Sequence, residues 1–207
     1  MKLGLLSTAR INELLVAGAR QASDVEVVAI GSRDRVRAEA QAQALGVPRA
    51  HGSYEALLAD PDVEAVYVAL PNSLHVEWSL RALQAGQHVL CEKPLSRHPD
   101  DVARAFAAAQ RGGLVLAEGF MWRHHPQAQQ LVDLLDEIGE LRRAGGAVER
   151  IAVEALNPYA CELEDFAAAV AGVRPQRYGR EDALAQARTI AALYASAETN
   201  EPMEAEP

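Results

Sequence analysis

The sequence is poor in cysteine, basic residues and long apolar runs, and each shortage argues against a class of protein. Two cysteines, Cys91 and Cys161, are too few for a disulfide framework, so we expect free thiols in a reducing cytosol. No segment reaches the apolar length that a membrane-spanning helix requires. The N-terminus also lacks the basic region, apolar core and cleavage site of a secretion signal. We therefore expect a cytoplasmic protein with no membrane partner.

Acidic residues outnumber basic ones by 29 to 20, which gives a formal net charge of −9. A nucleic-acid partner would require a basic face, so this charge argues against one, and it argues equally against adhesion to anionic lipid. The apolar fraction of 49% and the charged fraction of 24% are those of an ordinary globular chain. Its 207 residues suffice for one buried core, or for one domain with an appendage.

Short apolar runs alternate with amphipathic segments over the first two thirds of the chain. Runs such as Val-Val-Ala-Ile suit strands that are buried on both faces of a parallel sheet. We expect strands at 2–7, 25–32, 63–70, 88–93 and 114–120. We expect helices at 11–21, 35–45, 54–59, 75–85 and 100–111. This alternation predicts an α/β fold, a doubly wound parallel sheet that is Rossmann-like.

The last third of the chain departs from this rhythm. We expect a helix at 126–137, a Gly-containing linker at 139–146, a strand-like run at 148–156, and helices at 159–171 and 180–196. One strand and two helices cannot form a core of their own, so the C-terminal helices should pack back on the sheet. The expected organisation is a dinucleotide-binding domain at 1–142, a linker, strand and helices at 143–200, and a disordered acidic tail at 201–207.

The turn after the first expected strand lacks the glycines of a dinucleotide-binding fingerprint. Ser7, Ala9 and Asn12 stand where that fingerprint has glycine. Because Ser7 and Ala9 are small, the backbone stays open to a pyrophosphate. Thr8 adds a hydroxyl group, and Arg10 adds a positive charge beside a helix N-terminus that already attracts anions. The alternative is an ordinary corner in which a hydroxyl group only caps the helix, and these residues alone leave both readings open.

The end of the second expected strand reads Gly31-Ser32-Arg33-Asp34. A free ribose 2′-hydroxyl usually meets Asp or Glu at this point, whereas a 2′-phosphate meets Arg and hydroxyl donors. Gly31 leaves room here, and Ser32 with Arg33 could bind a phosphate dianion. Asp34 either competes for the ribose or only caps the next helix. NADP(H) is therefore the favoured cofactor, with NAD(H) as the alternative.

Glu92, Lys93 and Pro94 end another buried strand, at the edge where open α/β sheets bind ligands. A cis bond before Pro94 would turn the Lys93 side chain across the strand ends. Lys93 could then exchange a proton with a substrate hydroxyl during hydride transfer, or stabilise negative charge on its oxygen. The alternative is a polar strand terminus with no part in catalysis.

Four motifs occur in a specific order along the chain. They are Ser-Thr-Ala-Arg-Ile-Asn at 7–12, Ala-Leu-Pro-Asn-Ser-Leu-His at 69–75, Cys-Glu-Lys-Pro at 91–94 and Glu-Gly-Phe-Met-Trp-Arg-His-His-Pro at 118–126. With them, the sequence over 1–142 resembles the Gfo/Idh/MocA oxidoreductases, especially NADP-dependent xylose dehydrogenases and dimeric dihydrodiol dehydrogenases. Similar proteins often carry Ser-Thr-Ala in the first turn, which implies that the missing glycines are a tolerated variant.

The resemblance implies a site for a pyridine dinucleotide and for a small sugar or diol, with Lys93 as the catalytic residue. Trp122 and Arg123 are implied near the nicotinamide or the substrate. The other implied cofactor contacts are Ser7, Thr8, Ala9, Arg10, Ile11, Ser32, Arg33, Leu70, Pro71, Asn72, His75, Glu92 and Lys93.

Some of these residues have plausible structural roles. Without the resemblance, Asn72 would be a turn residue, His75 a solvent-facing residue and Trp122 a core or lid aromatic. Adjacent His124 and His125 point apart, and no third ligand has suitable spacing, so we expect no metal site.

The resemblance is interrupted between residues 142 and 157. Similar enzymes continue there into a large sheet domain that covers the nicotinamide, supplies much of the substrate pocket and commonly forms the dimer interface. Here a short connector leads to segments that resemble the family's C-terminal helices. The resemblance thus implies a monomeric cofactor-binding domain that lacks most of its substrate domain, through engineering or natural deletion.

Three functions remain open at this point. The first is an NADP(H)-binding domain derived from a sugar or diol dehydrogenase, with little or no activity. The second is a residually active NADP-dependent sugar dehydrogenase. The third is an engineered folding module or scaffold that binds no nucleotide.

Overall fold

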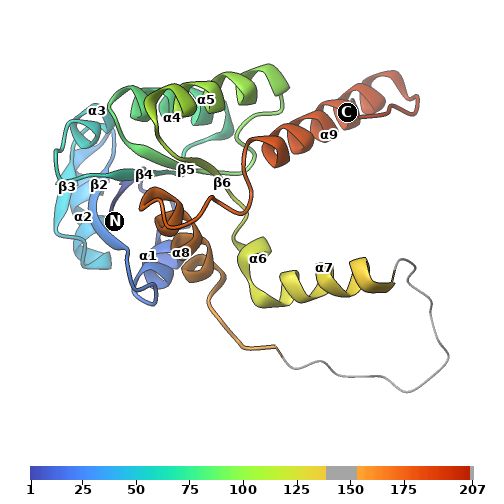
Figure 1. The fold of residues 1–207 in the computed structure, drawn as a ribbon. Coiled ribbons are helices and arrows are strands. Elements are labelled where there is room, and N and C mark those ends of the chain that lie inside the picture. Colours follow the sequence, from blue (N-terminus) through green and yellow to red (C-terminus); the bar gives the residue numbers. More distant parts are fainter. Residues whose placement is uncertain (139–152, 206–207) are drawn as a thin grey trace.

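The computed structural model describes residues 1–138 and 153–205. At its centre is a six-stranded sheet with the strand order β3-β2-β1-β4-β5-β6, in which every neighbouring pair is parallel (Figure 1). Its strands are β1 (Lys2–Leu6), β2 (Glu26–Gly31), β3 (Arg49–His51), β4 (Ala65–Val68), β5 (His88–Glu92) and β6 (Leu116–Gly119). The strand order reverses direction between β1 and β4, which is where open α/β sheets bind their ligands.

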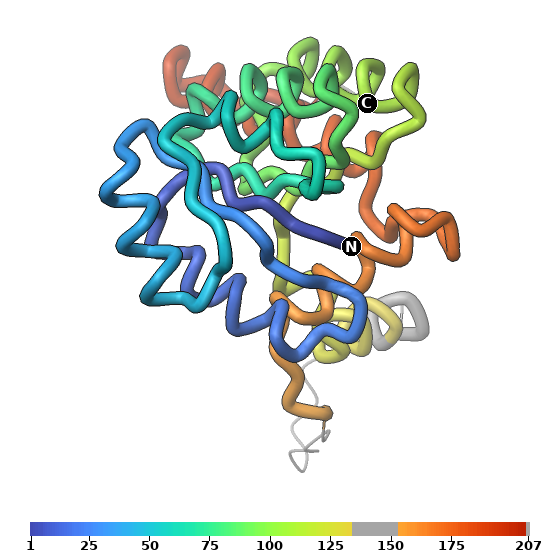
Figure 2. The backbone as a smooth tube through the Cα atoms, turned by 90° about the vertical axis from the view of Figure 1, so that its left-hand side faces the viewer, coloured from blue at the N-terminus to red at the C-terminus, as the bar shows by residue number. Residues whose placement is uncertain are grey.

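Helices cover both faces of the sheet. They are α1 (Asn12–Ala19), α2 (Arg35–Leu45), α3 (Tyr54–Leu58), α4 (His75–Gln84), α5 (Pro99–Gly112), α6 (Met121–His124), α7 (Pro126–Ile138), α8 (Pro158–Val170) and α9 (Arg180–Thr199), with a short 3₁₀ turn at Asn72–Leu74. One apolar core joins the sheet to α3, α4, α5 and α9, and the other joins it to α1, α2 and α8. Figure 2 shows these two helical layers on either side of the strands.

The C-terminal helices pack back on the sheet domain, as predicted. On α8, Leu163 and Phe166 are almost fully buried in the same core as α1, and Phe166 lies close to Leu90 of β5 and Ala117 of β6. A glycine permits this close approach, because a Cβ atom added to Gly18 of α1 would lie 2.5 Å from the Cβ of Tyr159. On the other face, Ala183 and Ala187 of α9 join the core beneath α5. Figure 1 shows α6 and α7 leaving the end of β6 and running away from the sheet.

The structure differs from the sequence-based expectations at three places. β3 was not expected, because its three residues are only half-buried and carry two polar side chains. The short helix α6 was also missed. The strand expected at 148–156 is wrong for 153–156, which have no regular structure, while 148–152 and the linker at 139–146 lie outside the described residues. Within 1–138 and 153–205, no helix combines the length and apolar character needed to span a bilayer.

Candidate functional site

The turn between β1 and α1 has a glycine-like conformation despite its serine. Ser7 has a backbone φ of 135°, within the region that favours glycine, and its N–H donates to the Gly31 carbonyl at 3.0 Å. Its hydroxyl accepts a hydrogen bond from the Ala9 N–H at 3.1 Å. The position before α1 is Ile11, which makes no side-chain cap, so helix capping does not explain Ser7 or Thr8.

Free backbone donors follow directly after Ser7. Among the described residues, the N–H groups of Thr8, Arg10 and Ile11 have no hydrogen-bond acceptor. They precede the first turn of α1, where the helix dipole favours negative charge. This arrangement suits a phosphate group.

The loop after β2 and the start of α2 contribute a hydroxyl group and two arginines, Arg33 and Arg37, to the same edge. Ser32 is 6% exposed, and its hydroxyl accepts a hydrogen bond from the Asp34 N–H at 3.2 Å. Asp34 caps α2, because its Oδ1 accepts from the N–H groups of Val36 and Arg37 at 2.9 and 3.2 Å. Of the two roles left open for Asp34, capping is therefore the one seen in the structure.

These elements surround a cleft of about 450 Å³ at the carboxyl edge of β1, β2 and β4. Its lining includes much of the predicted cofactor set: Ser7, Thr8, Ala9, Ser32, Arg33, Leu70 and Pro71. Arg37 and Tyr54 also line the cleft and were not predicted. Arg37 lies four residues after Arg33, in the first turn of α2, and this second arginine close behind Arg33 was the available signal.

The corner after β5 holds Lys93 beside a fixed carboxylate. The Lys93 Nζ lies 3.5 Å from Glu92 Oε2, and the side chains are 42% and 14% exposed, respectively. The fully buried Tyr67 donates its hydroxyl hydrogen to Glu92 Oε1, and burial, followed by the Glu92 charge, raises the pKa of Tyr67. The Lys93–Pro94 peptide bond is cis, as expected.

His75 connects two of the loops at this edge. Its ring is 1% exposed, and its nitrogens lie 2.8 Å from the Pro94 carbonyl and 2.7 Å from the Leu70 carbonyl. The solvent-facing alternative for His75 is therefore wrong, and its direct role is to link the two loops. Asn72, by contrast, is exposed and begins the 3₁₀ turn.

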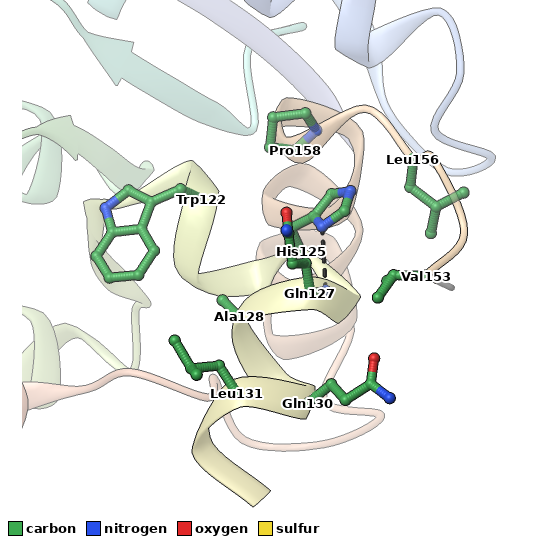
Figure 3. Close-up of a pocket in the computed structure, with 9 residues that line it drawn as sticks. All are labelled: Trp122, His125, Gln127, Ala128, Gln130, Leu131, Val153, Leu156 and Pro158. Carbon is green, nitrogen blue, oxygen red and sulfur yellow. Dashed lines mark hydrogen bonds between the residues drawn. The ribbon is translucent and has the colours of Figure 1, made fainter. Parts of the chain in front are cut away.

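The other predicted residues, Lys93 among them, do not line this cleft, and Trp122 and Arg123 lie in surroundings of their own. Trp122 is 56% exposed and borders a separate cavity of about 580 Å³ between α6, α7 and the approach to α8 (Figure 3). Arg123 forms a bidentate ion pair with Asp182 of α9, at 2.6 and 2.7 Å, and lies over the Tyr178 ring at 3.8 Å from its centroid. The structure therefore does not bring Trp122 or Arg123 together with the cleft residues.

Buried carboxyl groups lie behind Lys93 and were not anticipated. Glu162 of α8 is 2% exposed, and burial, followed by the charge of Glu92, raises its pKa. Glu118 accepts the Leu95 N–H at 2.7 Å, and burial raises its pKa to about 7. Nearby, burial lowers the pKa of His124 to about 4. No group of three or more potential metal ligands occurs in the described part of the chain.

A parallel sheet in this strand order, with a polar cleft at its carboxyl edge, defines a dinucleotide-binding α/β protein. The family model described as "Oxidoreductase family, NAD-binding Rossmann fold" matches residues 4–120. The chain belongs to this family, Gfo/Idh/MocA, as its motifs predicted.

Similar proteins include several sugar and diol oxidoreductases. The chain is 48% identical over 140 residues to a D-xylose 1-dehydrogenase (NADP(+)) of Haloferax volcanii. The aligned region covers 67% of this chain and 43% of that protein. It is 39% identical over 145 residues to a trans-1,2-dihydrobenzene-1,2-diol dehydrogenase of Xenopus laevis, which covers 68% of this chain and 44% of that protein.

A solved structure with the same architecture is a 3-ketoreductase from Actinomadura kijaniata in complex with TDP-benzene and NADP. It has a TM-score of 0.62 and 43% sequence identity, and covers 66% of this chain and 42% of that chain. The present chain spans less than half the length of these relatives.

Proposed function

We propose that the chain binds NADP(H) in the cleft at the carboxyl edge and forms the cofactor-binding part of an oxidoreductase that acts on a sugar or diol hydroxyl. One observation carries this proposal: Thr8, whose backbone N–H has no acceptor among the described residues, lines the same cleft as Ser32 and Arg33, and the free N–H groups of Arg10 and Ile11 follow it directly in the chain. The NADP named for the Haloferax and Actinomadura relatives supports the choice of cofactor.

Each part of the cleft has a distinct task in binding. The free N–H groups of Thr8, Arg10 and Ile11 would hold the pyrophosphate. The hydroxyl of Ser32 and the guanidinium groups of Arg33 and Arg37 would bind a ribose 2′-phosphate. Asp34 also lines this cleft, and its Oδ1 is held by the N–H groups of Val36 and Arg37, while Arg33 and Arg37 supply two positive charges beside it.

Lys93 is the residue we assign to proton transfer. When bound, the nicotinamide accepts or supplies the hydride. The Lys93 side chain would accept the hydroxyl proton as a neutral amine when the substrate is oxidised, and would return it as an ammonium group when a carbonyl is reduced. Glu92, held by Tyr67, would fix its position. Because the Lys93 side chain is 42% exposed, water has access to the reacting edge, so we expect weak or no turnover from this chain.

Fluorescence titration with NADPH tests the binding proposal. We expect Arg33→Asp to weaken binding by about tenfold or more, because it places a negative charge against the 2′-phosphate. Arg35→Asp is the matched control, because Arg35 is exposed and pairs with Glu39 outside the cleft. Unchanged affinity in Arg33→Asp, or an equal loss in both variants, would remove Arg33 from the 2′-phosphate site.

Steady-state NADP reduction across a panel of sugars and diols tests the catalytic assignment. If the chain turns over any of them, Lys93→Met should lower the rate by about a hundredfold or more, because the proton acceptor is lost. Lys2→Met is the control, since Lys2 is the only other lysine of the chain. Equal rates in Lys93→Met and the unaltered chain would eliminate catalysis through Lys93.

We also expect the chain to be a cytoplasmic monomer that binds no nucleic acid. The net charge of −9 supports the last point. Sedimentation velocity would test the monomer directly.

A further inference from the structure

Two side-chain amides join the β1–α1 turn to helix α2. Asn12, the first residue of α1, is 0% exposed, and its Nδ2 donates to the Ser7 carbonyl and to Gln41 Oε1, both at 2.9 Å. Gln41 of α2 in turn donates from its Nε2 to the Ala9 carbonyl at 3.2 Å. The carbonyl groups of Ser7 and Ala9, on the two sides of Thr8, are thus each fixed by a side-chain amide. One amide belongs to α1 and the other to α2.

The Asn12–Gln41 pair holds the backbone at Ser7, which is in a conformation that serine does not favour by itself. Ser7 has a φ of 135°, which a residue with a Cβ rarely adopts, so other contacts must stabilise it. The Ser7 N–H is fixed by Gly31, and the Ser7 carbonyl by Asn12. The free N–H groups of Thr8, Arg10 and Ile11 lie within and directly after this held segment.

Fold stability alone accounts poorly for Asn12. Its Oδ1 is buried and has no hydrogen-bond partner among the described residues. An unsatisfied buried acceptor reduces the net stability that a polar side chain contributes. The two bonds from its Nδ2 run toward the turn and toward α2, which is where a ligand-positioning role would require them.

We propose that Asn12 and Gln41 are positioning residues for the dinucleotide's pyrophosphate. Their amides hold the turn so that the N–H groups of Thr8, Arg10 and Ile11 converge on one anion, a task that glycines perform in the usual fingerprint. This inference rests on the proposed NADP(H) binding. It adds that Asn12 and Gln41, which do not line the cleft, contribute to the affinity for the dinucleotide.

Replacement of Gln41 by methionine tests the proposal, because methionine keeps the length of the side chain and removes both hydrogen bonds. Gln41 is half-buried on the face of α2 toward the β1–α1 turn and belongs to neither apolar core, so the fold should persist, and circular dichroism melting would verify this. Gln43→Met is the matched control, since Gln43 is exposed on the same helix. Each protein is titrated with NADPH by fluorescence and with adenosine 2′-monophosphate by NMR.

We expect Gln41→Met to weaken NADPH binding by about tenfold and to leave the affinity for adenosine 2′-monophosphate unchanged. The reason is that the monophosphate carries the 2′-phosphate but no pyrophosphate. Gln43→Met should match the unaltered chain for both ligands. The difference between the two affinities separates a positioning role from a general disturbance of α2, because such a disturbance would weaken the binding of both ligands.

Three results would overturn the inference, and they can be told apart. Unchanged NADPH affinity in Gln41→Met refutes the positioning role alone. An equal loss for both ligands shows a general effect of α2 and also refutes it. Failure of the unaltered chain to bind NADPH at all refutes the proposed function, and the inference with it.

Discussion

Ser7 occupies a backbone conformation with φ at 135° that the dinucleotide fingerprint reserves for glycine. The hydrogen bonds of its N–H to Gly31 and of its carbonyl to Asn12 replace the conformational freedom that glycine would supply. A small polar residue therefore suffices at this position when its surroundings hold the backbone from both sides. Motif searches that demand glycine here would pass over this turn.

Glu118 provides a residue-scale prediction about pH. Burial raises its pKa from 4.5 to about 7, so between these values the folded chain binds a proton that the unfolded chain has released. The contribution of Glu118 to the free energy of unfolding is therefore complete below pH 4.5 and is lost as the pH rises toward 7. Glu118→Gln cannot ionise and keeps an oxygen for the Leu95 N–H.

We expect the stability of Glu118→Gln relative to the unaltered chain to increase between pH 5 and pH 8, by about 2 to 3 kcal/mol. Urea unfolding at the two pH values measures this change. Titration of His124 occurs in both proteins and cancels from the difference. Glu198→Gln, near the exposed end of α9, should show no such change. A pH-independent difference for Glu118→Gln would show that this carboxyl group is ionised in the folded chain.

The sequence predicted those site residues that occur in contiguous motifs. Ser32 and Arg33 follow a strand directly, and both line the cleft. The hydrogen bonds of Gln41 and the burial of Glu162 could not be predicted in the same way, because each arises from packing against an element distant in the sequence. Arg123 shows the converse: its motif indicated the nicotinamide region, yet Asp182, 59 residues away, holds its guanidinium group.

At the scale of elements, α9 is connected to the end of β6 by one charged contact. Arg123 of α6 is held by Asp182 and lies over Tyr178, and the side chains of Arg123 and Asp182 are 24% and 31% exposed. The contact fixes the start of α9 against the segment that follows the sheet. Together with the packing of α6 against α8, it holds α6 in place.

We predict that Asp182→Asn destabilises the chain by about 2 kcal/mol, because it leaves a partly buried guanidinium group without its charge partner. The remaining exposure of both side chains keeps the loss below that of a fully buried pair. Glu181→Gln is the control, since Glu181 is the exposed neighbour on the same turn. Chemical denaturation measures both, and equal stability of the two variants would show that this ion pair contributes nothing.

Elements with long periodic patterns could be predicted, and short ones could not. Helix α5 matches its expected range closely, because its apolar residues recur at helical spacing. Helix α2 also matches, although its alanines alternate, because Asp34 and Gly46 mark its two ends. β3 has only three residues, and it belongs to the sheet because it pairs with β2. The sequence of β3 alone does not predict this pairing. α6 has four residues, too few for any periodicity.

At the scale of the whole molecule, two helical layers enclose a parallel sheet (Figure 1). The cleft lies at the carboxyl edge of this sheet. Neither α8 nor α9 lines this cleft, although both pack back on the sheet. The part of the chain that matches its relatives thus keeps the cleft residues together, even though the chain spans less than half of their length.

A crystal structure of the unaltered chain with NADP tests this account most directly. The account predicts the pyrophosphate on the backbone N–H groups of residues 8–11 and the 2′-phosphate beside Ser32 and Arg33, with the nicotinamide toward Lys93. A cofactor bound at any other place, or a cleft that stays empty at saturating NADP while the fold is intact, would contradict it.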